Sequence, residues 1–582
     1  RFLLWRVYLT HDVPAQIMHE IIKSLCREDI HIKACSRWVR LLYSMKNIFR
    51  LIAIIAVLLS GCRKEEQLRL PPVPQWYRDM LSLHSQDKVF VKAAKDGGDW
   101  VISFTDMDYR ISAGDVVIYD CSLTGKPDIH LDDRGRWVAQ GSPTGIPSTK
   151  GKPFSDSYPV FTYLYGDTFN IATSNGETVV FLFQKPIRAE RFTMPRVKVY
   201  HNADRIHKSY AIDGTIVIED PDGHFSEART LEGTVSIQGR GNSTWDMPKK
   251  PFKIKFPAKN EVLGMPSNKS WVFLANYSDK SLLRNVVGMT TSSIMEMQWT
   301  PEFRIVEVWI NDDYQGVYNL FQKKDVGRNK VDIDVAAGDM YLEIESSFDE
   351  PLYFYTGRCS VPVQFKEPNA PTDEQYQSVV SLFNDFETAL YSSDFRDPVK
   401  GYAAYIDVDS FIDNYIIREL AKDIDGNVRK SAFVTVLKST GKIKFCHVWD
   451  FDLSYGNANY FPGDMSECNG DPNGPYGWYV RDYNSNCVKA DGWYNRLFQD
   501  PEFVKKVKIR WAEVYPELKR MPEYIAKYSA EMGDAVSRNF EKWDILNEWV
   551  WPNVKVTGSY AGELEWLEEF YMTRLKWLDS KF

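Results

Sequence analysis

The sequence predicts an α+β protein whose strand-rich front half is followed by a helical back half. Up to about residue 370, short runs of β-branched and aromatic residues alternate with Gly, Asp and Pro turns, a pattern typical of strands. Beyond that point, apolar residues recur at i, i+3 and i+4, which indicates helices with one buried face. Strands and helices that segregate along the chain in this way favour an α+β fold.

A small all-β accessory domain is expected over residues 75–190. Its predicted strands are Val89–Val91, Trp100–Phe104, Asp115–Tyr119, Arg136–Ala139 and Thr178–Phe183. The stretch Gly135–Gly141 reads Gly-x-Trp-x-x-x-Gly and is similar to hairpins in accessory domains of secreted Bacteroidetes proteins. Since no cluster of catalytic residue types accompanies it, we expect a spacer or a ligand-docking module.

The second, larger domain is expected over residues 191–582. Its predicted strands are Val197–Tyr200, Thr215–Glu219, Gly233–Gln238, Phe252–Phe256, Ser270–Leu274 and Phe303–Ile310. Its predicted helices are Gln375–Leu390, Ile406–Ala421, Phe503–Val514, Met521–Phe540 and Gly562–Leu578. Between the helices, Ser431–Leu437 and Lys442–Val448 are predicted to pair as a hairpin.

Length and charge limit the classes of protein that fit. A chain of 582 residues is too long for one hydrophobic core, so two or three domains are expected. The formal net charge is -8, whereas nucleic-acid-binding domains usually carry a strongly basic face. We therefore expect no nucleic-acid partner.

The segment that begins at Met45 has the pattern of a secretory signal peptide. Basic Lys46 and Arg50 precede the apolar run Leu51–Ser60, and small residues follow. The run is about half of the roughly 20 residues that a membrane-spanning helix needs. We therefore interpret residues 45–61 as a signal peptide and residues 1–44 as upstream sequence that the mature protein lacks.

The residues around Cys62 resemble a bacterial lipobox. The stretch Leu58–Cys62 reads Leu-Leu-Ser-Gly-Cys, in which the Cys would be lipidated and become the new N-terminus. Lys64-Glu65-Glu66 resembles the surface-export signal of Bacteroidetes lipoproteins. Residues 62–74 then form the lipidated Cys and a Pro-rich tether. This predicts an outer-membrane lipoprotein on the cell surface, with the periplasmic face as the alternative and the lipid as the only membrane contact.

Cysteine spacing offers no zinc motif, because the chain has no Cys-x-x-Cys pattern. Five cysteines remain after Cys62, so at least one thiol is expected to be unpaired within the chain. Cys468 and Cys487 bracket one loop rich in Gly, Asn and Pro, and a disulfide between them would fit an oxidising compartment.

A glycine turn followed by lysines could bind phosphate. A predicted strand runs into Gly239-Arg240-Gly241, whose bare backbone can approach a phosphate closely. The segment that follows carries Lys249, Lys250 and Lys253, as a kinase glycine loop is followed by a strand-borne lysine. The alternative is a tight β-turn with exposed lysines on an edge strand.

A polar segment follows the strand Ser270–Leu274. Asp279 stands where a helix N-cap belongs, and its carboxylate would accept hydrogen bonds from free backbone N–H groups. Arg284 could pair with a carboxylate or a phosphate.

Acidic residues stand at both ends of the predicted hairpin. Asp423 and Asp425 precede it, while Asp450 and Asp452 follow it, so we expect the two clusters to converge. Clustered carboxylates are costly unless a cation neutralises them, which predicts Mg²⁺ or Mn²⁺ at this place. Surface or loop-capping aspartates are the alternative interpretation.

Taken in order, these motifs resemble the CotH kinase family, which is similar to atypical protein kinases. The resemblance covers about residue 195 to the C-terminus and rests on the glycine turn, the lysine segment and the Trp-Asp-Phe-Asp stretch. Gly316–Tyr318 and Tyr341–Glu343 also match the family pattern. It implies a kinase-like domain over residues 191–582 that uses ATP with Mg²⁺ or Mn²⁺ to phosphorylate protein.

The resemblance also implies roles for single residues. Lys250 would hold the nucleotide phosphates, with Lys249 and Lys253 as alternatives, and should lie opposite the aspartates across one cleft. Asp425 would orient the acceptor hydroxyl, and Asp450 and Asp452 would bind metal. Supporting roles would fall to Glu343, which could anchor the lysine or the metal, to Arg284 and to Asn427.

The sequence departs from the family at one point: beyond Asp425 it has Arg429, Lys430 and Ser431 where the family often has Asn, which leaves Asn427 as the nearby amide. Two functions are therefore carried forward. One is a phosphotransferase that acts on Ser or Thr of an extracytoplasmic protein. The alternative is a non-catalytic surface protein on a kinase-like scaffold that binds a glycan or protein through its long aromatic-rich loop, residues 457–491.

Overall fold

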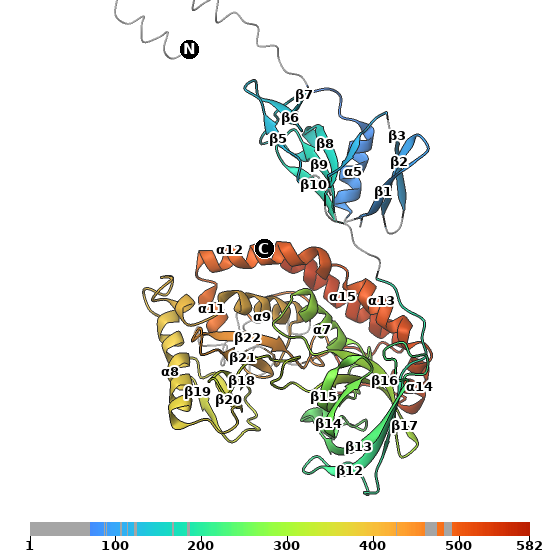
Figure 1. The fold of residues 1–582 in the computed structure, drawn as a ribbon, viewed down its shortest axis with the longest axis vertical. Helices are drawn as coiled ribbons and strands as arrows, with labels where there is room; N and C mark the ends of the chain where they lie inside the picture. The colour runs from blue at the N-terminus through green and yellow to red at the C-terminus, as the bar shows by residue number, and fades with distance from the viewer. Residues whose placement is uncertain are drawn as a thin grey trace, which may run out of the picture. The chain divides into compact units, whose positions relative to one another are not determined.

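The computed structural model describes residues 70–582, apart from residues 87, 89, 105–106, 113, 122–124, 166–167, 183–186, 427, 460–473 and 482–491. The chain divides into two compact units between residues 186 and 187, close to the predicted boundary at 190 (Figure 1). The predicted signal peptide, Cys62, Cys468 and Cys487 lie outside the described residues, as does Asn427. No helix in the described part of the chain is long and apolar enough to cross a membrane.

The first unit combines three small sheets with one helix. The helix is α5 (Gln75–Ser85). The sheets are β1 (Phe90–Asp96), β2 (Asp99–Phe104) and β3 (Asp108–Ser112); β10 (Thr178–Leu182), β9 (Thr168–Thr173), β8 (Pro159–Tyr165) and β4 (Ile118–Asp120); and β5 (Ile129–Leu131), β6 (Arg136–Ala139) and β7 (Ser142–Pro147). A short 3₁₀ turn, η1 (Phe154–Asp156), precedes β8.

The prediction that this unit is all-β is wrong in one respect, namely α5. Its buried side chains, Trp76, Tyr77, Met80 and Leu83, follow helical spacing and pack among the strand side chains of the same core. The helix shields one side of sheets that are too small to bury their apolar faces alone.

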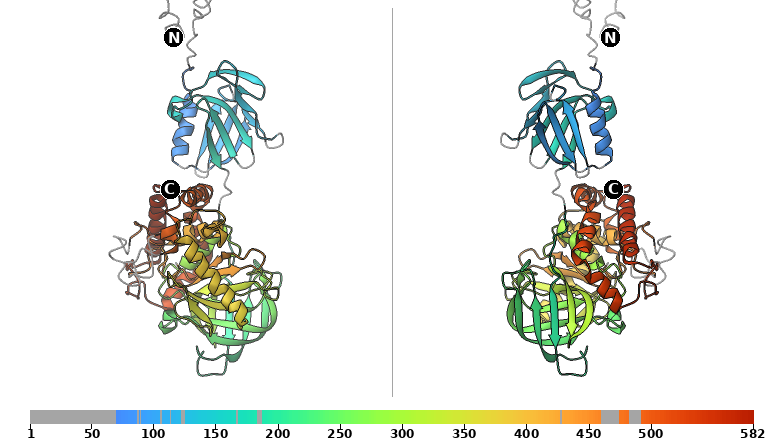
Figure 2. Two further views of the ribbon diagram at one scale, coloured as in Figure 1. Left: turned by 90° about the vertical axis from the view of Figure 1, so that its left-hand side faces the viewer. Right: turned by 90° about the vertical axis from the view of Figure 1, so that its right-hand side faces the viewer.

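The second unit begins with a closed seven-stranded barrel, β11-β12-β13-β14-β15-β17-β16 (Figure 2). Its strands are β11 (Arg196–Tyr200), β12 (Ile212–Glu219), β13 (Thr230–Gly239), β14 (Phe252–Val262), β15 (Met265–Leu274), β16 (Phe303–Ile310) and β17 (Asp313–Gln322). Neighbours pair antiparallel except β11 and β16, whose parallel pairing closes the barrel.

Alternating side chains explain why these strands close on themselves. Along β14, Phe252, Ile254 and Phe256 point into the barrel core, while Lys253 and Lys255 point outward. The same alternation on β11, β12 and β13 fills the interior with aliphatic side chains. All six strands predicted for the front of this domain are confirmed, while β17 was not predicted.

A five-stranded antiparallel sheet follows the barrel, in the order β19-β20-β18-β21-β22. Its strands are β18 (Met340–Ile344), β19 (Tyr353–Tyr355), β20 (Pro362–Glu367), β21 (Ala432–Val436) and β22 (Ile443–Val448). The predicted hairpin is thus confirmed as β21 and β22.

Helices complete the second unit and confirm the helical back half. They are α6 (Ser243–Asp246), α7 (Arg284–Ile294), α8 (Asp373–Leu390), α9 (Val408–Ala421), α11 (Trp493–Leu497), α12 (Pro501–Leu518), α13 (Met521–Met532), α14 (Ala535–Lys542) and α15 (Tyr560–Asp579), with the 3₁₀ turn η2 (Tyr402–Ala404). Helix α9 packs on β22, and α12 and α15 pack on α9 (Figure 1). The helix predicted over Met521–Phe540 is two helices, because the chain turns at Gly533.

Candidate active site

Two aspartates follow β22 in the turn Asp450–Asp452. The hydroxyl of Ser431 donates a hydrogen bond to Asp450 Oδ2 at 3.2 Å. Burial raises the pKa of Asp452 well above its ordinary value, and the neighbouring carboxylates of Asp450 and Asp425 raise it further. The structure therefore brings Asp425, Asp450 and Asp452 together at the base of the β21–β22 hairpin.

Helix α7 holds the turn Asp450–Asp452 in place through contacts with Phe451. Buried Asn285 accepts a hydrogen bond at Oδ1 from the backbone N–H of Phe451, at 2.9 Å. At Gly288, an added Cβ would lie 2.1 Å from the Phe451 ring, so glycine is what allows the helix to come this close. Because Phe451 stands between the two aspartates, α7 holds both carboxylates in place.

A buried ion pair holds the segment that carries Asp425. Arg418 on α9 pairs with Asp423, and both side chains are fully buried. The same guanidinium donates to the carbonyl of Trp449 at 3.0 Å and to that of Ser431 at 2.8 Å. One arginine therefore ties the end of α9 to the start of β21 and the end of β22. At Gly426, a Cβ would lie 2.0 Å from Arg418 Nη1, so the loop passes this pair without room for a side chain.

Asp425 itself remains partly accessible. Its Oδ1 accepts a hydrogen bond from Arg429 Nη1 at 2.9 Å. Burial raises the pKa of Asp425, Lys430 and Arg429 oppose that shift, and Asp450 adds to it. A carboxylate in this setting accepts a hydrogen bond more readily than an exposed one.

The glycine turn folds tightly onto α6. An added Cβ at Gly239 would lie 2.2 Å from the Trp245 ring, and one at Gly241 would lie 2.2 Å from Thr244 Oγ1. Gly241 also has a φ of +88°, which disfavours any other residue. The turn therefore depends on both glycines to direct Arg240 between them.

Arg240 points into the space in front of the aspartates. Its guanidinium carbon lies 5.9 Å from the centroid of the Trp449 ring. Burial lowers the pKa of Arg240, while the charges of Asp450, Asp452 and Glu343 oppose that shift. Arg240 is thus a cation that faces the aspartate pair in the structure.

The three lysines of the predicted phosphate site separate. Lys249 is buried, and its Nζ donates to the Val317 carbonyl at 2.6 Å and to Asn539 Oδ1 at 2.8 Å. Burial lowers the pKa of Lys249 well below its ordinary value. Lys250 turns away instead, and its Nζ donates to the Trp245 carbonyl at 2.7 Å.

Lys253 is the one of the three that lies on strand β14 and shares a side with Arg240. Because it is partly buried and close to Lys323 and Arg240, its pKa is lowered. Lys249 and Lys250 precede the strand, where the sequence could not assign an inward or outward direction. The alternation that sends Phe252 and Ile254 into the barrel core turns Lys253 outward.

Lys324 was not predicted, although it lies beside the same ring. Its Nζ is 2.7 Å from Glu343 Oε1, 4.1 Å from the Phe433 ring centroid and 5.9 Å from that of Trp449. Glu343 is buried and also accepts a hydrogen bond from Gln364 at 2.9 Å. Glu343 also pairs with Lys366, at 3.3 Å. Lys323 and Lys324 directly follow β17.

Two other predicted residues have different surroundings. Arg284 pairs with Asp279 at 2.6 Å with both side chains fully buried, and Asp279 also accepts the backbone N–H of Arg284 at the start of α7. This pair stabilises the start of the helix, as expected for Asp279, and does not face the aspartates of the hairpin.

A cavity of about 30 Å³ lies between Arg240 and the pair Asp450 and Asp452, with Lys249 and Asn285 also in its wall. It has room for roughly two water molecules. Within the described ranges, no three His, Cys, Asp or Glu side chains form a complete metal-binding cluster. The two carboxylates nevertheless fit a divalent cation that takes its other ligands from phosphate and water, because Arg240 already stands in as their counter-charge.

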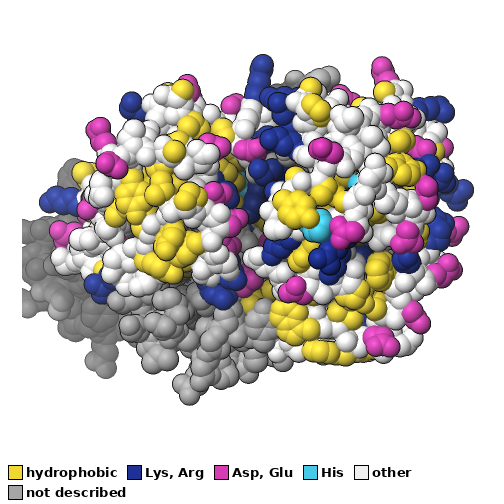
Figure 3. All heavy atoms as spheres, turned by 90° about the horizontal axis from the view of Figure 1, so that it is seen from below, with side chains coloured by type: hydrophobic (Ala, Val, Ile, Leu, Met, Phe, Trp, Pro, Cys, Tyr) yellow, Lys and Arg dark blue, Asp and Glu magenta, His cyan; other side chains and the backbone are white. Residues whose placement is uncertain are grey.

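Basic side chains gather on one face of the second unit. Figure 3 shows Lys and Arg side chains in the hollow between the barrel and the other half of the unit. Lys253 lies close enough to Lys323 and Arg240 for each to lower its pKa. A polyanionic ligand would therefore be attracted from this side.

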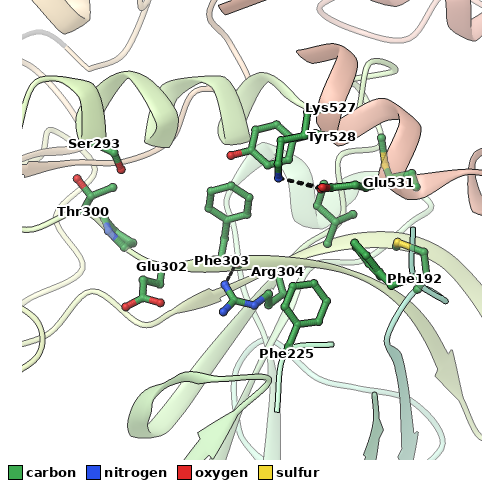
Figure 4. Close-up of a pocket in the computed structure, with 14 residues that line it drawn as sticks. Phe192, Phe225, Ser293, Thr300, Glu302, Phe303, Arg304, Lys527, Tyr528 and Glu531 are labelled. Atoms are coloured by element: carbon green, nitrogen blue, oxygen red, sulfur yellow. Dashed lines mark hydrogen bonds and ion pairs between the residues drawn. The ribbon is translucent and has the colours of Figure 1, made fainter. Parts of the chain in front are cut away.

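A separate cavity of about 280 Å³ lies between β16, α13 and the end of α7 (Figure 4). Three of its charged groups have partners within the chain. Lys527 pairs with Glu531 at 2.9 Å, and Arg304 donates to the carbonyls of Phe303 and Leu263. None of the predicted site residues lines it, so we assign it no part in the chemistry.

One comparison with known proteins identifies a family. A family model described as CotH kinase protein matches residues 237–578, which is more than half of the chain. The matched region contains the glycine turn, α7 and the aspartate hairpin. No curated protein matches the chain.

Proposed function

Because the chain belongs to the CotH kinase family, which makes it a kinase-like protein, we propose that it transfers the terminal phosphoryl group of ATP, in the presence of Mg²⁺ or Mn²⁺, to a Ser or Thr hydroxyl of an extracytoplasmic protein. The observation that carries the proposal is the position of Arg240, which faces the neighbouring carboxylates of Asp450 and Asp452 across one cavity. Opposite charges on the two sides of a cavity suit a phosphate and its cation together.

Asp450 and Asp452 would hold the divalent cation. A bound cation would neutralise the phosphate oxygens and lower the barrier to transfer. The residues of the chain do the remaining work of positioning. Arg240 and Lys324, both close to Trp449, would bind phosphate oxygens, and Lys253 would extend this basic surface toward the cleft mouth.

Asp425 would accept the hydrogen bond of the acceptor hydroxyl. Its raised pKa and its nearness to Asp450 support this role, since phosphoryl transfer needs an oriented hydroxyl more than a strong base. The guanidinium of Arg429 would keep the Asp425 side chain in one orientation.

A triphosphate is larger than the present cavity, so nucleotide binding would require the turn around Arg240 to move. The segment that would move is short, and it is held by the contacts of its two glycines with α6. We therefore expect the nucleotide to displace Arg240 from its position over Trp449. The Arg240 and Trp449 side chains would then each contact the bound nucleotide.

The extracytoplasmic setting of the proposal rests on the sequence alone. Lipidation at Cys62 would anchor the chain in the outer membrane, with the folded units on the cell surface. A globomycin-treated culture that accumulates the uncleaved form, together with loss of membrane association in Cys62→Ser, would support this location. A Cys62→Ser chain that stays membrane-bound would contradict it.

A transfer assay tests the activity. The full chain is incubated with γ-labelled ATP, Mn²⁺ and dephosphorylated casein as a generic Ser/Thr acceptor. We expect transfer that falls about 100-fold or more in Asp450→Asn, since one charge of the site is lost. Asp409→Asn, an exposed aspartate on α9, is the matched control and should keep full activity. Absence of transfer to casein and to the chain itself, or equal transfer by Asp450→Asn, would refute the proposal.

A further inference from the structure

An open groove of about 680 Å³ lies beside the candidate active site. One side comes from the α6 segment, and the other from residues 544–551, which follow α14. The side chains that give the groove its character are Tyr277, Trp549, Trp551, Asp246, Asp544 and Glu548.

Aromatic rings form its apolar part. Trp549 and Trp551 are 56% and 39% exposed, which is unusual for residues of this size. The indole N–H of Trp549 donates to the Asn553 carbonyl at 2.8 Å, so its polar atom is satisfied within the chain. What Trp549 offers a ligand is therefore the flat face of the ring.

The segment that carries these rings is anchored to the rest of the unit. Asn553 Nδ2 donates to the Ser278 carbonyl at 2.7 Å and to Asn457 Oδ1 at 2.8 Å. Lys280 Nζ donates to the Glu548 carbonyl at 2.5 Å. The groove is thus formed before any ligand arrives, which reduces the entropic cost of binding.

The polar part of the groove consists of hydrogen-bond acceptors. Asp246, Asp544 and Glu548 are all exposed, and no Lys or Arg is among the described residues that line the groove. A matching ligand must therefore carry donors, such as hydroxyl or ammonium groups, and must also have flat apolar faces.

We propose that this groove binds carbohydrate. The C–H faces of sugar rings would stack on Trp549 and Trp551, and their hydroxyls would donate to the three carboxylates. A purely apolar partner would strip water from those carboxylates without replacing its hydrogen bonds. A basic peptide would satisfy the carboxylates and could stack its cations on the indoles, so it is the competing ligand that the experiment must distinguish from a sugar. A sugar satisfies both parts of the surface.

The groove adjoins the cavity of the aspartates, because Met247 and Tyr277 line both. A bound sugar would therefore lie next to the phosphoryl-transfer site. The binding itself does not depend on transfer, so Asp450→Asn should bind the same sugars even if it has lost transferase activity.

Titration calorimetry of the full chain against cellohexaose, chitohexaose, mannohexaose and laminarihexaose tests the proposal. We expect at least one of them to bind, with a loss of about tenfold or more in Trp549→Ala and in Trp551→Ala. Tyr355→Ala removes an equally exposed ring on β19 and should leave the affinity unchanged. Circular dichroism and the unfolding midpoint establish that each variant is folded.

Asp544→Asn gives a second readout that leaves the aromatic rings intact, and we expect it to weaken sugar binding several-fold. Failure of all four oligosaccharides to bind, or unchanged binding in both Trp variants, overturns the proposal. Binding of an octalysine peptide without any sugar binding, lost in Asp544→Asn, would overturn it in favour of a basic peptide ligand. Sugar binding in a protein that shows no phosphoryl transfer would support the carbohydrate proposal and refute only the enzymatic one.

Discussion

Among the aspartates at the hairpin, Asp452 has the pKa that differs most from its ordinary value. Burial and the charge of Asp450 favour its protonated form. The folded state then keeps a proton that the unfolded chain releases at about pH 4. As the pH rises from this value through the raised pKa, the folded state loses stability relative to the unfolded one.

We therefore predict that Asp452→Asn stabilises the protein at about pH 8 in metal-free buffer, because the amide needs no proton. The difference from the parent should shrink as the pH falls toward 4. Urea unfolding of both proteins across this range, with EDTA present, measures it. The control, Asp409→Asn, should show no trend with pH, and a difference for Asp452→Asn that is constant with pH would contradict the prediction.

The pair of Arg418 and Asp423 gives a second prediction at this scale. Asp423→Asn leaves the arginine charge buried without its partner, which should cost about 3–5 kcal/mol in the free energy of unfolding. In the exposed pair of Lys506 and Asp409, Asp409→Asn should cost less than about 1 kcal/mol. Urea unfolding compares the two, and equal effects would show that burial does not determine the outcome.

Sequence patterns predicted the acidic part of the site and the glycine turn that carries Arg240, but not Lys324. Asp425 and Asp450 could be placed together because one predicted hairpin joins their segments. Lys324 could not be found in this way, since its partner Glu343 reaches it only through the pairing of β18 with β20 and β21. Lys250 was favoured by resemblance, and the turn onto α6 that removes it from the cavity has no local signature.

At the scale of the element, the position of α7 depends on Gly288, which allows the helix to pack closely against Phe451. Nearly all of its side chains are buried, the polar ones included, so α7 has no solvent-exposed polar face opposite an apolar one. The strands were easier to predict because inside and outside residues alternate along them. The closed barrel was not predicted, because no local pattern reveals that β11 pairs with β16.

We predict that Gly288→Ala destabilises the protein although alanine is the better helix former by about 1 kcal/mol. The added Cβ would meet the Phe451 ring, and overpacking of this kind costs about 1–3 kcal/mol while it displaces both aspartates. Phosphoryl transfer and the unfolding midpoint should therefore fall together.

Gly327→Ala is the matched control for that experiment. Its nearest neighbour would be Lys330 Cε at 3.4 Å, an ordinary contact, and its φ is not in the range that favours glycine. We expect a change of at most about 0.5 kcal/mol. A Gly288→Ala variant with the same stability and activity as this control would show that α7 can shift without harm.

At the scale of the whole molecule, the division between residues 186 and 187 predicts that the second unit folds alone. Residues 187–582 should unfold cooperatively and should transfer phosphate to casein as well as the full chain does. A shorter piece, residues 201–582, lacks β11 and should expose the barrel interior. Solubility, circular dichroism and the unfolding transition distinguish the two, and a cooperative transition in the shorter piece would contradict the prediction.

The parallel pairing of β11 with β16 also governs the order in which the barrel can form. Arg196 pairs with Glu307, so the first strand waits for more than one hundred residues of synthesis before its second neighbour exists. Until then, the nascent sheet has two open edges that can pair with other chains. Pairing between such distant strands closes slowly, so the open barrel is exposed to aggregation until β16 has been made.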